Sequence, residues 1–458
     1  MSPIALGMSI RKEARALLPM WAVCAAALIL AGLAGDRRVA EGGRLVYLLG
    51  SLSLASWSIG HEYTHRTLPI LLSLPLSRPR LLLMKLAVVI PLLVMLSALA
   101  LTLLPPSSRG LGRQEFPALV GGLAVVCALI LAPLITMLCR SPLAGVVFAA
   151  GITGWVYLLA QVAALAMYGS AEPLIERNQF TMTLSLWGFA SVAGLGAVAG
   201  WLAFMQLEAI DGLPDVHWPR GWRRTAVAQP VARRRHPFWL LVLKELRLQQ
   251  MSFTVAGLFI FGGLAISMLS TVVPEFKGAP EPMVALNGLT LAWLIGSMAS
   301  AEERHLGTLE WQTLLPVAAW QQWIVKAAVT LGLALLLGSG LPTLFAIDGP
   351  QLNPVYLGII VVLATASLYV SSLCSSGLRT LTVSGPAILL LFFPLGRFIR
   401  PFDPLAMSSF EGLLLAGLLV LALCFAFENH RSAERNFRRV GRQLLVMTAV
   451  LALIAGRF

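Results

Sequence analysis

The sequence predicts an all-α integral membrane protein with two parallel-repeat bundles of six transmembrane helices each. Three observations lead to this prediction: the apolar composition, the length of the apolar runs, and a set of polar residues that recurs in the same order. Of the 458 residues, 58% are hydrophobic and only 12% are charged. A soluble domain carries about 25% charged residues, so lipid is the expected solvent for most of this chain.

The apolar runs are long enough to cross a bilayer as helices. Crossing a hydrocarbon core of about 30 Å takes roughly 20 apolar residues, and these runs are continuous, which favours helices over a barrel. The first six expected spans are 18–35, 44–60, 81–104, 118–138, 142–167 and 183–205. The next six are 252–273, 283–300, 322–345, 355–373, 380–396 and 412–427. The stretch 444–456 is an extra short hydrophobic helix that either spans the membrane or lies at its surface.

The net charge of +13 would suit a protein that binds nucleic acid, but its distribution points to a membrane. With a cytoplasmic N-terminus, most Lys and Arg residues fall on the cytoplasmic side, including the clusters 220–247 and 431–442. This positive-inside bias predicts a multi-pass protein of the cell membrane with a cytoplasmic N-terminus. We expect the clusters to contact membrane lipid headgroups and no nucleic acid.

Polar residues recur in the same order and divide the chain into halves, 1–231 and 232–458. Lys12-Glu13 before the first span matches Lys244-Glu245 before the seventh. After the second and eighth spans, six pairs match at a constant separation of 241 residues: Glu62 with Glu303, Thr67 with Thr308, Leu68 with Leu309, Leu74 with Leu315, Pro75 with Pro316 and Lys85 with Lys326. Since six is even, both halves insert with the same orientation, as parallel repeats do.

The stretch 301–317, which follows the eighth span, reads as a short helix on the cytoplasmic surface. Gly307 and Thr308 suit a turn followed by a helix start, with Thr308 as the N-cap. Leu309 and Pro316 then frame a helix that lies across the span axes. Such a helix offers a ridge that docks into a groove on a soluble partner. The stretch 61–78 is its counterpart in the first half.

These two stretches resemble the type-2 ABC transporter permeases. That family's pattern after the second span is an acidic residue, Gly-Thr-Leu-Glu, Leu-Leu and Pro, often ending in Ser-Arg. The second half keeps Glu303, Gly307, Thr308, Leu309, Glu310, Leu314, Leu315 and Pro316. The first half keeps Glu62, Thr67, Leu68, Leu71, Leu72, Pro75, Ser77 and Arg78, but has Arg66 and Pro69 where glycine and the second glutamate are expected. The resemblance covers essentially the whole chain in span order, and these stretches are its specific part.

The resemblance implies the permease subunit of an ATP-driven exporter. We name 61–78 and 301–317 the coupling segments, because in the family they contact a separate nucleotide-binding (ATPase) subunit, here expected in two copies. The residues expected at that contact are Glu62, Thr67, Leu68, Pro75, Glu303, Gly307, Thr308, Leu309, Glu310, Leu315 and Pro316. The family also implies an amphipathic elbow helix before each half, at 9–18 and 238–249.

The chain itself is expected to be no enzyme. A Walker A loop needs glycines followed by Lys-Ser or Lys-Thr. The five lysines, Lys12, Lys85, Lys244, Lys277 and Lys326, are followed by Glu, Leu, Glu, Gly and Ala. ATP and magnesium are therefore expected on the partner subunit, and no cofactor, metal or catalytic residue is assigned to this chain.

Two alternatives stay open from the residues alone. His61-Glu62-Tyr63-Thr64-His65 matches the zinc motif His-Glu-x-x-His, in which both histidines hold the metal and the glutamate activates water. This match allows an intramembrane metalloprotease, although the second half has no counterpart of either histidine. An ion-coupled secondary transporter is the other alternative, but it needs ionisable residues inside the bilayer. The expected spans hold almost none, and Gln161 and Asn287 are the most polar buried candidates.

Overall fold

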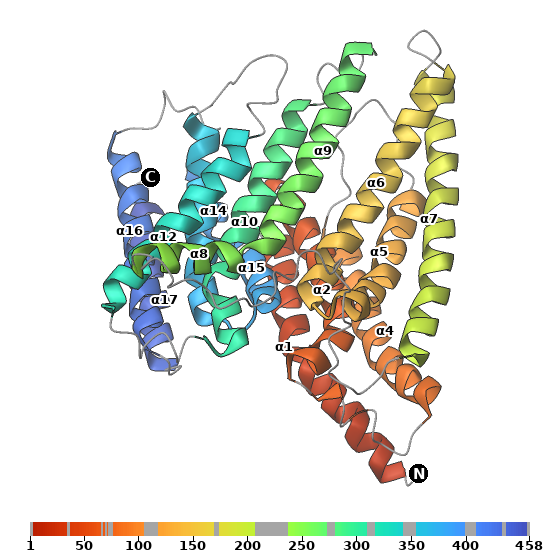
Figure 1. Ribbon diagram of the computed structural model, residues 1–458, viewed down its shortest axis with the longest axis horizontal. Helices are drawn as coiled ribbons and strands as arrows, with labels where there is room; N and C mark the ends of the chain where they lie inside the picture. Colours follow the sequence, from red (N-terminus) through yellow and green to blue (C-terminus); the bar gives the residue numbers. More distant parts are fainter. Residues whose placement is uncertain are drawn as a thin grey trace, which may run out of the picture.

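The computed structural model describes residues 3–33, 37–65, 67–68, 71, 77–104, 118–168, 174–206, 237–272, 280–308, 317–341, 354–398, 409–432 and 437–455. Within these ranges every regular element is a helix (Figure 1). The first half contains α1 (Pro3–Leu33), α2 (Arg37–Thr64), α4 (Arg78–Leu103), α5 (Ala118–Cys139), α6 (Pro142–Tyr168) and α7 (Leu174–Met205). The second half contains α8 (Pro237–Leu248), α9 (Gln250–Val272), α10 (Pro280–Leu306), α12 (Ala319–Leu335) with its π-helical continuation η3 (Leu336–Gly340), α14 (Pro354–Leu373), α15 (Gly377–Phe398), α16 (Ser409–Arg431) and α17 (Phe437–Ala455).

Among the described residues, eight helices are long and apolar enough to cross a membrane. These are Ile10–Leu33, Arg78–Leu103, Gly122–Cys139, Pro142–Ala164, Glu176–Met205, Gln250–Met268, Ala319–Gly340 and Tyr356–Leu373. The other four expected spans fall on α2, α10, α15 and α16, which are also helices. Buried serines such as Ser53 and Ser56 on α2 and Ser297 on α10 lower the apolar character of the two inner helices. The fold is thus an all-helical, membrane-embedded one.

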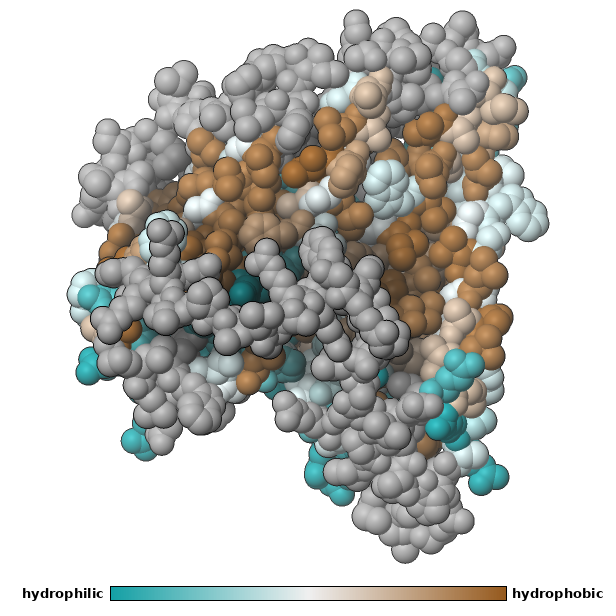
Figure 2. Space-filling model, viewed as in Figure 1, coloured by the Kyte–Doolittle hydropathy of each residue, from teal (hydrophilic) through white to brown (hydrophobic). Residues whose placement is uncertain are grey.

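Large apolar side chains cover much of the outer surface. Leu101 is 84% exposed, and Leu195 and Phe261 are each 72% exposed. Figure 2 shows brown, hydrophobic residues in a broad band over α6 and α7, with teal residues gathered along the lower edge. Soluble monomers rarely expose apolar patches of this extent, so the band is the surface that faces lipid.

The two expected elbow helices differ in the structure. In the second half, α8 is a separate helix that lies across the direction of α9 and α10 (Figure 1). Gln249 forms the turn between α8 and α9, and its side-chain amide donates a hydrogen bond to the Ile295 carbonyl (3.1 Å). In the first half, 9–18 is not a separate element but the beginning of α1, which continues through Pro19. The run Ala14 to Leu18 consists of good helix formers, so nothing before Pro19 ends the helix.

The core is built around α2 and α10. Helix α2 packs on α1, α4, α5 and α6, and α10 packs on α9, α12, α14 and α15. The first helical turn of α15 joins the two groups: the Arg379 guanidinium lies over the Trp57 ring at 5.1 Å, and Gly377 lies close to Glu302 and Leu143. The core cluster accordingly includes residues of both halves, from Leu17 to Leu381.

Helix α17 contains the extra apolar stretch expected at 444–456, as far as Ala455, and a buried polar contact holds this helix in place. Gln443 is fully buried, and its amide donates to Asn429 Oδ1 (3.2 Å) and Glu428 Oε2 (2.9 Å) on α16. The Tyr369 hydroxyl of α14 donates to Gln443 Oε1 (3.3 Å). Packing on α14 and α16, and not only contact with lipid, therefore fixes this helix.

The close contact of α10 with α14 gives a direct test of the packing. A Cβ added at Gly296 would lie 2.1 Å from Ser367 Oγ and 2.6 Å from the Ala364 carbonyl oxygen. We expect Gly296→Ala to destabilise the protein by about 1–3 kcal/mol, because the backbone oxygen cannot move away without shifting a helix. Gly358→Ala on α14 is the matched control, because nothing lies within 4 Å of its added Cβ. Denaturant unfolding in detergent should show loss of stability for the first variant, and no loss for the second.

Candidate functional site

A cluster of buried charges lies where α8, α10 and α12 meet. We name it the second charge cluster, consisting of Lys244, Glu245, Glu303 and Lys326. Lys326 Nζ lies 2.8 Å from Glu303 Oε1, 2.9 Å from Glu245 Oε2 and 2.8 Å from the Ala299 carbonyl oxygen. Lys244 Nζ also donates to Glu303 Oε1 and lies 3.1 Å from Glu245 Oε1. Two cations and two carboxylates thus hold three helices together.

The first half contains a cluster of the same four residue types with corresponding contacts between the lysines and the buried glutamate. The first charge cluster consists of Lys12, Glu13, Glu62 and Lys85, from α1, α2 and α4, together with His61. Lys85 Nζ lies 2.8 Å from Glu13 Oε1 and 3.4 Å from Glu62 Oε1, and donates to the Ser58 carbonyl (3.0 Å). Lys12 Nζ lies 3.2 Å from Glu62 Oε1. Even the carbonyl acceptors correspond, because Ser58 and Ala299 are 241 residues apart.

The inner members of both clusters have almost no contact with solvent. Glu62 and Glu303 are 0% exposed, and Lys85 and Lys326 are 3% and 1% exposed. The outer lysines are more accessible, with 53% of the Lys12 side chain and 29% of the Lys244 side chain exposed. Desolvating charges is costly unless they are paired and hydrogen-bonded, and here every buried lysine has two carboxylate partners and a carbonyl.

The surroundings shift the carboxyl pKa values in different directions. Burial by itself would raise the pKa of Glu303, but Lys326 and Lys244 outweigh it and hold the pKa at about 2. For Glu62, burial is likewise outweighed by His61, Lys85 and Thr67, so its pKa lies well below the ordinary range. Burial dominates at Glu245 and raises its pKa, despite the nearby Lys326 ammonium. Glu62 and Glu303 are therefore the firmly ionised members.

Each buried glutamate also bonds a threonine five residues later in its coupling segment. The Thr67 hydroxyl donates to Glu62 Oε2, and the Thr67 amide donates to the Glu62 carbonyl (2.9 Å). The Thr308 hydroxyl donates to the Glu303 carbonyl (3.2 Å). Thr308 thus closes the end of α10, and the amides that it would accept from as an N-cap belong to residues outside the described part of the chain. Gly307 has a φ of +69°, a conformation that favours glycine at this turn.

The structure separates the expected partner-contact residues into two groups. Glu62 and Glu303 point into the charge clusters, so in this conformation they offer no surface to a partner. Thr67, Leu68, Gly307 and Thr308 are partly or fully exposed, and Leu68 packs against a small apolar cluster that includes Ile59 and Leu81. Pro75, Leu309, Glu310, Leu315 and Pro316 lie outside the described residues.

The two histidines of the His-Glu-x-x-His match do not converge. His61 is buried beside Glu13 and Glu62, whereas His65 is exposed and contacts the edge of the Trp57 ring (6.4 Å between centroids). The described residues that could share a metal ion are Glu13, His61 and Glu62, and His65 is not among them. This arrangement does not support a zinc protease built on that motif.

Sequence reasoning found the members of the clusters as repeat positions but missed that they form sites. Lys85 and Lys326 lie within expected spans, so the statement that the spans hold almost no ionisable residues needs correction. An ammonium group in an apolar span needs a buried counter-ion, and the only acidic residues repeated with it were Glu13 with Glu245 and Glu62 with Glu303. The search for a counter-ion would therefore have predicted that each of these lysines pairs with the two repeated glutamates of its half.

Comparison of the chain with protein-family models, with curated proteins and with solved structures found no match.

Proposed function

We propose that the chain is the permease of an ATP-driven exporter of the type-2 ABC class, with two six-helix halves related as parallel repeats. The observation that carries the proposal is the pair of charge clusters. In both clusters a glutamate near the start of a coupling segment contacts one lysine from earlier in the chain and one from later: Lys12 and Lys85 for Glu62, and Lys244 and Lys326 for Glu303. A device that occurs twice at the base of two coupling segments fits a protein driven at two points by two copies of a partner.

The turns that follow α5 and α14 support the repeat. Ser141 Oγ accepts from the Ala144 amide at the start of α6 (3.4 Å), and Ser376 Oγ accepts from the Arg379 amide at the start of α15 (3.4 Å). These serines are 235 residues apart, the same separation as Cys139 and Cys374. Local capping chemistry therefore recurs at a second place, independent of the charges.

The proposed mechanism uses the clusters as rigid joints. ATP binding draws the two partner subunits together and moves the coupling segments. Because Glu303 is tied to Lys244 of α8 and to Lys326 of α12, a displacement at Gly307 and Thr308 moves α8, α10 and α12 as one unit. Because α15 contacts α10 on one side and α1 and α2 on the other, this movement shifts the two halves between two arrangements. Such a change requires that ATP favour one arrangement over the other.

In this proposal the chain hydrolyses no ATP. ATP and magnesium are held by the partner, and the orientation places the coupling segments and the N-terminus in the cytoplasm. In this proposal Glu62 and Glu303 position the coupling segments, while Leu309 and Leu315 make the contact with the partner.

The test is to purify the tagged full chain with its ATPase partner and to measure subunit ratio, ATP hydrolysis and transport. We expect two ATPase copies for each chain, and loss of both copies in the variant Leu309→Asp with Leu315→Asp, because carboxylates would be buried in an apolar groove. Leu33→Asp is the control for introducing a carboxylate elsewhere, since Leu33 is 77% exposed at the C-terminal end of α1, away from the coupling segments. Transport by the chain without ATPase, or unchanged ATPase binding by the double variant, would contradict the proposal.

A further inference from the structure

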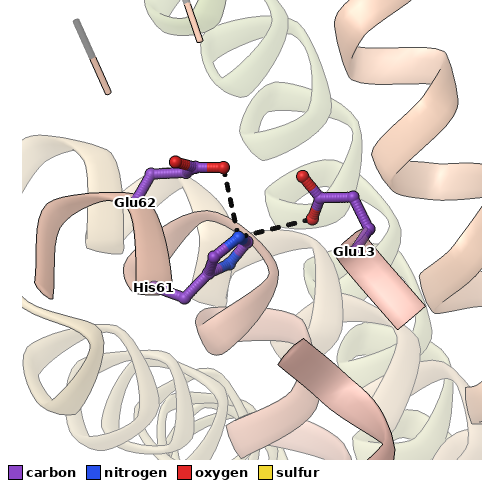
Figure 3. Close-up of side chains that lie close together, drawn as sticks. All are labelled: Glu13, His61 and Glu62. Atoms are coloured by element: carbon purple, nitrogen blue, oxygen red, sulfur yellow. Dashed lines mark ion pairs between the residues drawn. The ribbon is translucent and has the colours of Figure 1, made fainter. Parts of the chain in front are cut away.

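Three side chains with metal-binding atoms converge in the first charge cluster (Figure 3). His61 Nε2 lies 3.1 Å from Glu62 Oε1 and 3.5 Å from Glu13 Oε2, and all three ligand atoms lie within 4.8 Å of one another. The groups come from two helices, α1 for Glu13 and α2 for His61 and Glu62. All three residues are at least nine-tenths buried.

The hydrogen bond on the far side of the imidazole fixes its tautomer. His61 Nδ1 lies 2.9 Å from the Trp57 carbonyl oxygen, which only accepts, so Nδ1 carries a proton. In the neutral ring Nε2 then presents a lone pair toward the two carboxylates. Neither His61 Nε2 nor Glu13 Oε2 has a hydrogen-bond partner in the described part of the chain. Electron pairs from three groups face one point, and a cation at that point would satisfy them.

We propose that Glu13 Oε2, His61 Nε2 and Glu62 Oε1 bind a divalent first-row metal ion, with zinc as the expected species. Zinc at bond lengths of about 2.0–2.1 Å in a tetrahedral arrangement separates its ligand atoms by about 3.3 Å. The separations of His61 Nε2 from Glu62 Oε1 and from Glu13 Oε2, 3.1 and 3.5 Å, bracket that value. A backbone carbonyl on the other ring nitrogen is the usual outer partner of a metal-binding histidine.

The lysines of the cluster are compatible with a metal ion. Lys85 contacts Glu13 through Oε1, which leaves Oε2 open. Two lysines compete at Glu62 Oε1, Lys12 at 3.2 Å and Lys85 at 3.4 Å. The Lys12 side chain is 53% exposed and can turn into solvent, and Lys85 keeps its shorter contacts with Glu13 Oε1 and the Ser58 carbonyl oxygen. Three protein ligands leave one position for water. Zinc would replace the outer lysine and clamp α1 to the end of α2, where the segment 61–78 begins.

The second charge cluster lacks such a site and serves as an internal control. The position that corresponds to His61 is Glu302, whose side chain is 28% exposed and lies 3.8 Å from His305. Both oxygens of Glu245 accept from Lys326. One site for each chain is therefore expected, in the first half alone. This inference does not depend on the proposed transport function.

The experiment measures zinc on the purified full-length protein in detergent after chelation and dialysis against zinc. We expect about one zinc ion per chain, and His61→Gln and Glu13→Gln should each weaken zinc binding by at least about tenfold. His65→Gln and Glu245→Gln should bind zinc like the wild type. Zinc should also raise the unfolding temperature of the wild type and not that of His61→Gln.

Two results would overturn the site. The first is no zinc above background in the folded wild type. The second is zinc lost in His65→Gln but kept in His61→Gln, which would return the metal to the sequence motif. The unfolding measurement separates loss of the metal from loss of the fold in each variant.

Discussion

Lys326→Met is expected to destabilise the protein by about 3–5 kcal/mol, the cost of leaving buried charges without their partner. Lys326 is 1% exposed and is the fully buried one of the two ammonium groups that contact both Glu245 and Glu303. Methionine keeps most of the side-chain volume, so the change removes charge and leaves packing nearly intact. Two carboxylates then face each other in the interior with only Lys244 beside them. Denaturant unfolding in detergent micelles at neutral pH measures the loss.

Two further variants separate charge from packing. Lys244→Met should cost distinctly less, because the Lys244 side chain is 29% exposed and water can replace it. Combining Lys326→Met with Glu245→Gln and Glu303→Gln should recover much of the stability, since no buried charge is then left unpaired. A Lys326→Met protein within about 1 kcal/mol of the wild type would show that the cluster does not hold α8, α10 and α12 together.

The membrane fold could be predicted from the sequence because lipid solvation acts on each apolar run separately. All twelve expected spans fall on helices, and eight of these meet the length and composition of a span within the described residues. What the runs do not encode is which face of a helix turns inward. Glu302 and Glu303 are neighbours in the sequence, yet the first is partly exposed and the second is fully buried.

The position of Glu303 shows why its role was hard to predict. We expected the helix to end before the charged residues, which would place Glu303 on an exposed surface. Instead α10 continues to Leu306, so one turn beyond the expected span is still helical and turns Glu303 toward Lys326. The charge clusters join residues as far as 81 positions apart. Only packing of three helices brings them together, and helical periodicity alone does not specify it.

Helix α1 illustrates a second limit. The residue types of 9–18 and 238–249 are alike, and both were expected to form separate elbow helices. The break after α8 depends on Gln249, whose amide reaches the Ile295 carbonyl on another helix. No such tertiary bond is available to Leu18 and Pro19, and α1 continues. A boundary set by a distant acceptor cannot be read from local propensity.

Acid is expected to destabilise the protein through Glu303 and Glu62. The folded-state pKa of Glu303 is about 2, below its ordinary value of 4.5, and that of Glu62 is lowered as well. A carboxyl group with a depressed folded pKa contributes stability above its unfolded pKa and loses it as pH falls through the folded pKa. For Glu303 this contribution is about 3 kcal/mol at neutral pH. Unfolding at a series of pH values from 7 to 3 measures the part of this loss that occurs above the folded pKa.

Glu245 should behave in the opposite sense, which makes it the matched control for Glu303. Its pKa is raised, first by burial, so its contribution is fully present below the unfolded pKa and is lost as pH rises through the folded value. Glu303→Gln should therefore lose more stability at pH 7 than Glu245→Gln, and the difference in unfolding free energy between these two variants should narrow as the pH falls toward 3.

The double variant Glu62→Gln with Glu303→Gln tests both carboxylates together. Relative to it, the wild type should lose up to about 1.4 kcal/mol of stability per pH unit for each carboxyl group whose pKa is lowered. If that double variant follows the same acid profile as the wild type, the two buried carboxylates are not the ionised centres of the clusters. The lysines would then be held by the carbonyls of Ser58 and Ala299 and by the other glutamates alone.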